Sequence, residues 1–597
     1  MKQFFGAFFG SIVGLLITGI IMALIIGAFI AAGLKGALSG MDNEKVFTVK
    51  ENSVLHLKLD GPISERGVDN PFEEYDFGPF IPAGSLGVRG IVNSIDAAKS
   101  DDKIKGIYLD IKNLQAGFAT TQEIRDALLA FKKSGKFVYS YSEVYSQKSY
   151  YLATAASKIY MNPQGGMELK GLSMQLMFFK NMLEKMQVEA QIFRHGKFKS
   201  AIEPFMLDKM SEANRLQTET YLNSMWNSML DGISEERKIS SEKLNDLANT
   251  LGINSTEDAL NNKLVDGLLY EDEVMSLLKK DLKLKEKDKI TFAEIGKYEK
   301  QNRGGSKGKK LGKKNKIALI YAVGQINSGE GDDESIGSDR IAKAIKDARL
   351  DTTVKAIVMR VNSPGGSALA SDVIWREVTL AKKVKPFIVS MDDVAASGGY
   401  YISCAADRIF AQPNTITGSI GVFGMLPNAQ KMFADKFGIN IDTVNTNKHS
   451  DVGNIFRPVN EEEFKYIQSS VERVYETFIG RVAEGRNTTT AMVDSIGQGR
   501  VWSGTDALKI NLVDELGGTD DAIAYAAKMA KLSDYKMEEF PKRKDPFSML
   551  LGKGEEGLED RIMSKQLGEQ YKYLKFVKQV MDMKGVQMRL PYEMILN

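Results

Sequence analysis

The sequence has very few of the residues that build metal sites and disulfides. It contains one cysteine, Cys404, so no intrachain disulfide can form and no cysteine cluster for zinc exists. Histidine occurs only as His56, His195 and His449, and no HExxH-type spacing links them, so we expect no metal. Neither positive nor negative charge is in large excess, because the net charge is only +2. We therefore expect no nucleic-acid partner.

A charge-free apolar segment lies near the start of the chain. Residues 4–34 carry no charged side chain, whereas roughly 20 apolar residues suffice to cross a bilayer. The segment is too long for the apolar part of a cleaved signal peptide. We therefore predict an uncleaved single-pass anchor within residues 1–45, spanning the membrane at about 8–34. Lys2 favours a cytoplasmic amino terminus, although Lys35 and Lys45 weaken that rule.

The rest of the chain contains an internal duplication at a constant spacing. Residues 86–98 resemble 336–348, and residues 150–171 resemble 400–421, both at an offset of 250. Such a fixed register is the signature of a repeated domain. The predicted divisions are a first domain at 46–285, a basic linker at 286–315, a second domain at 316–540 and a helical tail at 541–597.

Short apolar runs alternate with longer amphipathic stretches in the second copy. Residues 317–321, 356–361 and 387–390 have the composition of buried strands, and residues 339–350 and 371–383 that of helices. This order predicts βαβ crossovers and a largely parallel sheet, so the expected fold class is α/β.

A comparison of the two copies singles out the turn at Ser397. This serine lies between a predicted strand and a predicted helix, where helix N–H groups face the turn. Its counterpart in the first copy is Gln147, and the following Gly398 and Gly399 are replaced there as well. The second copy therefore carries a candidate nucleophile, although an ordinary strand-to-helix junction also uses small residues.

Two further differences accompany the serine. Gly365 and Gly366 form a glycine turn that the first copy lacks, and a backbone N–H there can bind a developing oxyanion. A simple turn after proline is the alternative explanation. Conversely, the first copy has Lys199 where the second has His449 or Ser450, since one extra residue blurs the register.

Four segments together resemble a known family. They are residues 393–401 (DVAASGGYY), 362–366 (NSPGG), 417–422 (TGSIGV) and 199–205 (KSAIEPF). With these segments the chain is similar, over almost its whole length, to the long-form signal peptide peptidase A family. Those proteins are membrane-anchored serine peptidases related to caseinolytic protease and the crotonases. The resemblance implies two tandem crotonase-like, ClpP-like domains behind a transmembrane helix.

The resemblance also implies a role for each candidate residue. Ser397 is expected as the nucleophile, Lys199 as the general base and Ser419 as the residue that orients the lysine, with Gly365 and Gly366 in the oxyanion hole. A lysine serves as a base only when neutral, and burial away from carboxylates lowers its pKa. Glu203 must then point away from Lys199. This chemistry needs no cofactor.

The implied substrate is an apolar peptide. It is expected to add as a strand beside Gly365 and Gly366, with Gly398 and Gly399 giving it room. The family also implies cleaved signal peptides as substrates, a homotetramer, and a catalytic part on the periplasmic side of the bacterial inner membrane. The sequence leaves open whether Ser397 and Lys199 meet within one chain or between subunits. A crotonase-type acyl-CoA enzyme, a non-catalytic membrane scaffold and a triad using His449 remain alternatives.

Overall fold

The computed structural model describes residue 14, residues 17–22, 47–67, 86–305, 315–542, residue 563 and residues 585–590. The predicted membrane span at about 8–34 therefore lies mostly outside the described residues. Within the ranges given above, no helix has both the length and the apolar character needed to span a bilayer.

The first repeat is built on a parallel sheet with crossover helices. In its described part, each strand pairs in parallel with its neighbours. The crossover helices are α2 (Val88–Ser100), α3 (Phe118–Lys132) and α4 (Gln147–Ala153). The strand order is β2 (Leu86–Gly87), β1 (Ser53–Ser64), β3 (Ile104–Gln115), β4 (Phe137–Tyr145), β5 (Lys158–Met167) and β7 (Gly267–Leu268), with β8 (Thr291–Glu294) also beside β1.

The second repeat has the same architecture, which confirms the α/β prediction. Its crossover helices α12 (Ser338–Leu350) and α13 (Ala368–Lys382) lie where helices were predicted. Its central strands are almost fully buried, as expected for a sheet covered on both faces. The strand order is β18 (Val501–Ser503), β16 (Ile416–Gly418), β14 (Phe387–Ala396), β12 (Val354–Ser363), β9 (Lys316–Val323) and β20 (Lys536–Phe540), with β15 (Arg408–Ala411) beside β14 and β19 (Glu515–Leu516) beside β15.

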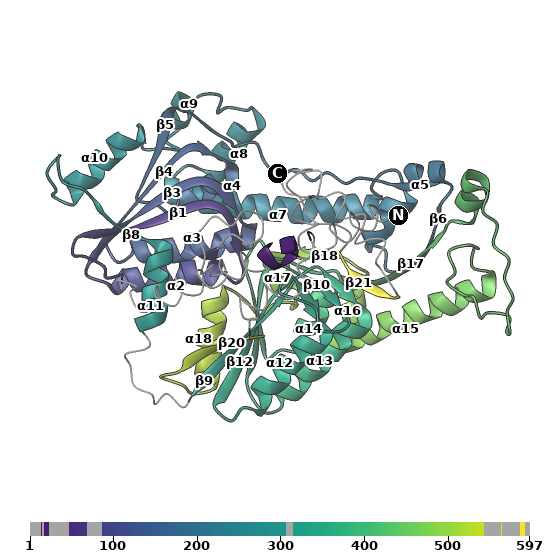
Figure 1. The fold of residues 1–597 in the computed structure, drawn as a ribbon. Coiled ribbons are helices and arrows are strands. Elements are labelled where there is room, and N and C mark those ends of the chain that lie inside the picture. Colours follow the sequence, from purple (N-terminus) through teal and green to yellow (C-terminus); the bar gives the residue numbers. More distant parts are fainter. Residues whose placement is uncertain are drawn as a thin grey trace, which may run out of the picture.

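A third sheet joins the two repeats. Its order is β11 (Ser335–Gly337), β10 (Gln325–Asn327), β13 (Gly365–Ser367), β21 (Gln587–Arg589), β17 (Val422–Asn428) and β6 (Glu189–His195). The edge strand β6 belongs to the first repeat and pairs antiparallel with β17 of the second along its whole length. Figure 1 shows the two strands side by side, away from the first-repeat sheet. The first repeat thus reaches into the second just before Lys199.

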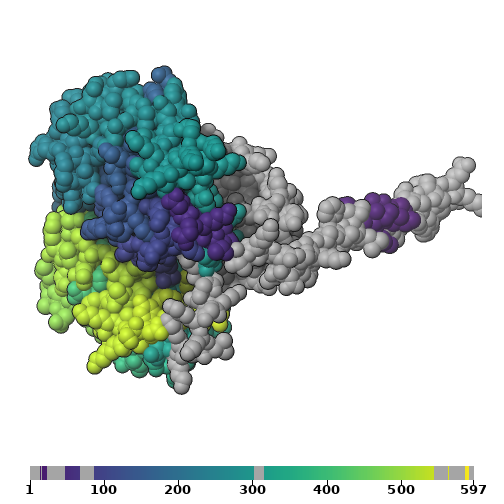
Figure 2. Space-filling view, turned by 90° about the vertical axis from the view of Figure 1, so that its left-hand side faces the viewer, coloured from purple at the N-terminus to yellow at the C-terminus, as the bar shows by residue number. Residues whose placement is uncertain are grey.

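A buried ion network also links the repeats. Arg360 on β12 is fully buried and donates to Glu65 and Glu123 of the first repeat, each at 2.9 Å. Its guanidinium also pairs with Asp392 on β14 at 2.7 Å. Figure 2 shows the blue and teal first repeat packed directly on the green and yellow second repeat. The network therefore fixes β14, the strand that leads to Ser397, against the first repeat.

The structure corrects two of the predicted divisions. Residues 286–305, expected as the start of the linker, contain β8 and α11 (Ile295–Gly305). Because β8 pairs with β1 as β20 pairs with β9, the first domain continues through α11. The helical prediction for the tail is wrong at residues 587–589, which form β21. An extended segment forms there because β13 and β17 both offer backbone groups that need partners.

Candidate active site

Lys199 and Ser397 meet at the boundary between the repeats, within a single chain. The Lys199 Nζ donates a hydrogen bond to Ser397 Oγ at 2.9 Å. Both side chains are buried, with exposures of 1% for Lys199 and 0% for Ser397. Strand β6 and the short turn after it deliver the lysine, and the end of β14 delivers the serine. The sequence left open whether the two residues meet within one chain, and the structure joins them in one.

The segment that carries Lys199 is held in place by α7 (Glu212–Arg237). Gln217 on this helix is buried, and its Nε2 donates to Phe198 O at 3.1 Å and to Ser200 Oγ at 3.0 Å. Its Oε1 accepts from Val501 N of the second repeat at 3.2 Å. Gln217 therefore fixes the residues on either side of the lysine to both repeats. Sequence reasoning missed it, since a lone glutamine in a long helix carries no local signal.

Ser397 adopts a backbone conformation that residues other than glycine rarely take, with φ +56° and ψ −113°. Such a conformation costs about 1–3 kcal/mol and persists only where its surroundings enforce it. Ser397 N donates to Gly418 O at 2.8 Å, and Ser397 O accepts from Tyr401 N at 2.9 Å. The strained turn is thus held from both sides, and it presents the hydroxyl to Lys199.

Gly398 and Gly399, which follow Ser397, pack closely against other parts of the chain. A Cβ on Gly399 would stand 2.6 Å from Ser363 O, and a Cβ on Gly398 would stand 3.1 Å from the Cα of Gly365. The turn after β12 therefore lies directly against the start of α14 (Gly398–Ser403). Room for substrate beside these glycines stays a prediction, and on the side of each Cβ position the space is taken by Ser363, Gly365 and Ser371.

A second hydroxyl flanks the lysine. Lys199 Nζ donates to Ser419 Oγ at 3.2 Å, and the Ser419 carbonyl oxygen lies 3.4 Å away. Ser419 also has a positive φ of 50°, and its N–H donates to Arg500 O at 2.7 Å. The structure thus brings together the three side chains that the sequence selected.

Burial sets the electrostatics of Lys199. Desolvation lowers the pKa of Lys199 to about 7. Glu203, four residues further on, is buried but accepts hydrogen bonds from Ser211 and Asn214 at the start of α7, so it points away from the amine. In the part of the chain that the structure covers, no carboxylate pairs with Lys199. The amine is therefore half neutral near pH 7, as a general base requires.

The backbone beside Ser397 offers a small space for an oxyanion. Gly365 has a φ of +96°, and the place where its Cβ would stand lies 2.6 Å from Gly398 N. Gly398 begins α14, and the first N–H groups of a helix lack acceptors within it. Gly365 N itself donates to Ser363 Oγ at 3.1 Å. The Gly398 amide is thus a candidate donor that the sequence analysis missed, although its place directly after the serine was a usable signal.

The other candidates lie apart from this site. Gln147, the first-repeat counterpart of Ser397, accepts from the N–H groups of Lys170 and Gly171 and donates to Gly171 O, so its amide fills that turn. The ring nitrogens of His449 contact Glu462 at 3.1 Å and Glu463 at 3.0 Å. The structure therefore does not support His449 as the base for Ser397.

Comparisons with known proteins agree with this geometry. The sequence profile of peptidase family S49 matches residues 130–285 and 379–533, one segment in each repeat. The chain is also 39% identical over 461 residues to Protease 4 of Salmonella typhi, covering 75% of this chain and 73% of that protein. The chain belongs to peptidase family S49. As a member of that family it is a serine peptidase, a hydrolase whose substrates are peptides.

One further relative supports the family assignment, whereas a similarity to a solved structure does not bear on it. The chain is 34% identical over 492 residues to the chloroplastic serine protease SPPA of Arabidopsis thaliana, covering 81% of this chain and 70% of that protein. Among solved structures, a mutant form of ClpP1 from Listeria monocytogenes is 17% identical, and the match covers 34% of this chain and 94% of that one. Its TM-score of 0.24 is too low to support any argument.

Proposed function

We propose that this S49 peptidase is a membrane-held endopeptidase in which Ser397 and Lys199 form the catalytic dyad. The observation that carries the proposal is the 2.9 Å hydrogen bond from Lys199 Nζ to Ser397 Oγ. It is supported by the burial that lowers the pKa of Lys199 to about 7, since an ordinary lysine would be charged and unable to accept a proton.

The dyad performs acyl transfer in two steps. Neutral Lys199 takes the proton of Ser397 Oγ as this oxygen attacks the peptide carbonyl carbon. The resulting ammonium then gives its proton to the departing amine, which leaves an ester on Ser397. A water molecule, deprotonated by Lys199, attacks this ester, and the resulting ammonium returns the proton to Ser397 Oγ as the acid is released. All of these proton transfers use groups of the chain, so the reaction needs no cofactor.

The neighbouring groups stabilise and direct these steps. Ser419 Oγ accepts from the lysine at 3.2 Å and keeps its Nζ aimed at Ser397. The oxyanion is assigned to the space beside Gly365, where the Gly398 amide and the Gly365–Gly366 turn converge. One such donor contributes about 10²–10³-fold to the rate in a comparable peptidase.

The cellular setting is part of the proposal. The charge-free residues 4–34 support a single membrane anchor, with the catalytic part on the periplasmic side of a bacterial inner membrane. An anchored peptidase meets apolar peptides that remain in the bilayer, and cleaved signal peptides are the proposed substrates. A homotetramer is the proposed assembly. Membership of a peptidase family disfavours the acyl-CoA enzyme and the scaffold.

The test is peptide hydrolysis by the full chain in detergent micelles, with an apolar peptide amide as substrate. Ser397→Ala and Lys199→Ala are each expected to lower kcat by at least about 10³-fold, because the dyad acts as a unit. Lys197→Ala is the matched control, since this exposed lysine lies two residues from Lys199 and should leave kcat unchanged. Full activity in either alanine variant of the dyad rules the mechanism out.

A further inference from the structure

A short strand from the carboxyl-terminal part of the chain lies across the candidate active site. Strand β21 runs antiparallel to β13, from Gly365 opposite Arg589 to Ser367 opposite Gln587. Its other edge pairs with β17. Beyond the strand, Leu590 N donates to Pro364 O at 2.8 Å. The strand therefore occupies the position beside Gly365 and Gly366 where an extended substrate was expected to bind.

The backbone of this strand reaches the proposed oxyanion space. The point where a Cβ on Gly365 would stand lies 2.0 Å from the Met588 carbonyl oxygen and 2.6 Å from Gly398 N. The Met588 carbonyl and the first amide of α14 therefore face the same small volume. A peptide carbonyl under attack by Ser397 would have to use that volume, so the strand and a substrate exclude each other.

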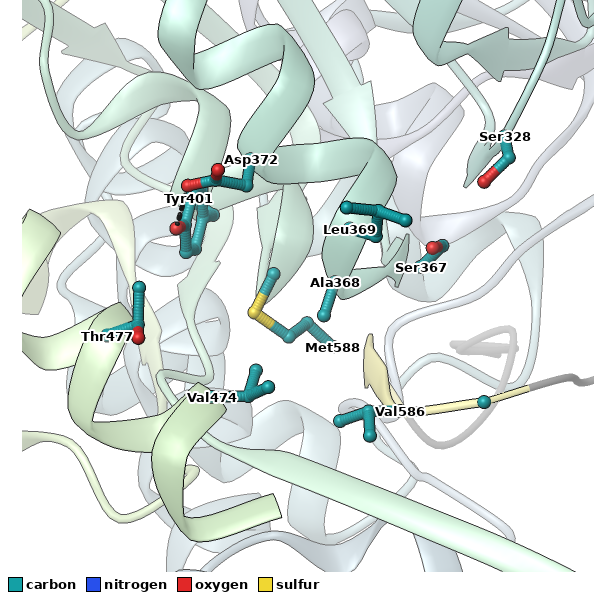
Figure 3. A pocket seen from close by; sticks show the side chains of 11 residues that line it. Ser328, Ser367, Ala368, Leu369, Asp372, Tyr401, Val474, Thr477, Val586 and Met588 are labelled. Atoms are coloured by element: carbon teal, nitrogen blue, oxygen red, sulfur yellow. Dashed lines mark hydrogen bonds between the residues drawn. The ribbon is translucent and has the colours of Figure 1, made fainter. Parts of the chain in front are cut away.

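The side chain of Met588 forms part of the wall of a pocket. Met588 is fully buried and points into a cavity of about 570 Å³. Figure 3 shows it surrounded mainly by apolar side chains, among them Ala368, Leu369, Val474 and Val586. One wall is the ring of Tyr401, whose hydroxyl donates to Asp372 at 2.6 Å. Such a pocket accepts an unbranched, flexible apolar side chain readily.

The burial of the dyad shows that something must move before catalysis. Ser397 has no exposed surface and Lys199 has 1%. A substrate carbonyl therefore cannot reach Ser397 in this arrangement. Strand β21 spans only three residues and lies between β13 and β17. Its departure exposes Met588 and Leu590, which are buried here, but it leaves β13 and β17 in place.

We propose that β21 is a built-in competitor of the peptide substrate, and that the Met588 pocket is the subsite that selects the substrate's side chain. This inference rests on the proposed peptidase function for the identity of the competing ligand. A substrate strand replaces β21 between β13 and β17. A side chain of the size of methionine or leucine then takes the place of Met588 at the wall of this cavity, while a carboxylate is rejected because the lining is mainly apolar.

The first test measures binding without catalysis. The full chain carrying Ser397→Ala is combined with either Met588→Asp, which expels the strand, or Met588→Leu, which keeps it seated. The probe is a fluorescent peptide with the sequence of residues 585–590, GVQMRL, followed by anisotropy. We expect at least tenfold tighter binding to the Asp variant, and no competition from the peptide GVQDRL. Equal affinity for both variants, or equal competition by both peptides, overturns the inference.

The second test uses the active chain and an apolar peptide amide. With Ser397 intact, Met588→Asp should lower KM at least tenfold while kcat stays unchanged, and Met588→Leu should match the wild type. A chain ending at Lys584 is the second variant, in case a buried aspartate disturbs folding, and a thermal melt checks both. If the wild type hydrolyses the peptide and the variants have the same KM as the wild type, the inference about β21 is contradicted, but the proposed peptidase function is not. Absence of hydrolysis in the wild type contradicts the proposed function, and the binding test still decides the inference.

Discussion

Lys199 donates to Ser397 at 2.9 Å, although the two residues come from opposite copies of a duplicated domain. The contact exists because β6 leaves the first repeat and pairs with β17 of the second. Each copy has kept one half of the site and lost the other, since Gln147 fills the turn that corresponds to Ser397. Neither repeat is therefore expected to be active alone.

The pH dependence of the reaction follows from the pKa of Lys199. Burial lowers this pKa to about 7, and only the neutral amine accepts the proton of Ser397. We therefore predict that kcat/KM rises with pH, is half maximal near pH 7 and is level by about pH 9. A pH–rate profile on an apolar peptide amide checks this. A midpoint near pH 10, roughly the ordinary lysine value, would show that burial leaves the amine unperturbed.

Substitution of Ser419 distinguishes the contribution of its hydroxyl from that of its backbone conformation. Ser419→Gly removes the hydroxyl that accepts from Lys199 at 3.2 Å but tolerates the φ of 50°. We predict a roughly tenfold fall in kcat, the equivalent of one hydrogen bond, with little change in melting temperature. Ser419→Ala should lower kcat similarly, and because serine and alanine both carry a Cβ at this φ, its melting temperature should also stay close to that of the wild type. Unaltered kcat in both variants would remove Ser419 from the mechanism.

Gly399→Ala tests the close contact between the turn after β12 and the start of α14, two residues from Ser397. Its new Cβ would stand 2.6 Å from Ser363 O, so the turn after β12 must shift. We expect lower thermal stability and at least a tenfold loss of kcat. Gly480→Ala is the control, since this glycine lies within α15 (Glu461–Gly485) with nothing within 4 Å of its Cβ position. It should gain up to about 1 kcal/mol from helix propensity. Equal stability of the two variants would refute the contact.

Arg360→Met tests the network between the repeats. The change leaves Glu65, Glu123 and Asp392 buried without their cation. Removal of one partner from such a network typically costs about 3–5 kcal/mol, so the melting temperature should fall markedly. Arg376→Met, at an exposed position on α13, should alter the melting temperature little. Similar melting temperatures for both variants would mean that the network does not hold the repeats together.

Local patterns predicted the parts of the fold that local forces determine. The runs at 317–321, 356–361 and 387–390 were recognisable as strands because parallel strands buried on both faces are continuously apolar. The site was recognisable for a different reason. The two copies differ at Ser397, where a fixed register makes the difference visible, whereas one extra residue blurs the register at Lys199, which the family resemblance singled out.

The elements that were missed depend on contacts between distant segments. Residues 586–590 do alternate apolar and polar side chains, but the run is only five residues long, and it pairs as β21 with β13 and β17, which lie far away in the sequence. Strand β8 likewise depends on its pairing with β1. The sequence analysis also missed Gly398 as a candidate oxyanion donor, because its position after Ser397 was a signal but the approach of the turn at Gly365 to α14 is seen only in the structure.

The most direct test of the dyad measures acylation of Ser397 itself. The full chain is treated with a serine-directed acylating reagent, and mass spectrometry follows the labelled peptide over time in the wild type and in Lys199→Met. We predict a single label on Ser397 and a rate that rises with a midpoint near pH 7. In Lys199→Met the rate should be at least about 10³-fold slower, because the two residues act as a unit. Labelling of another residue, or an equal rate without the lysine, would contradict the Ser397–Lys199 mechanism.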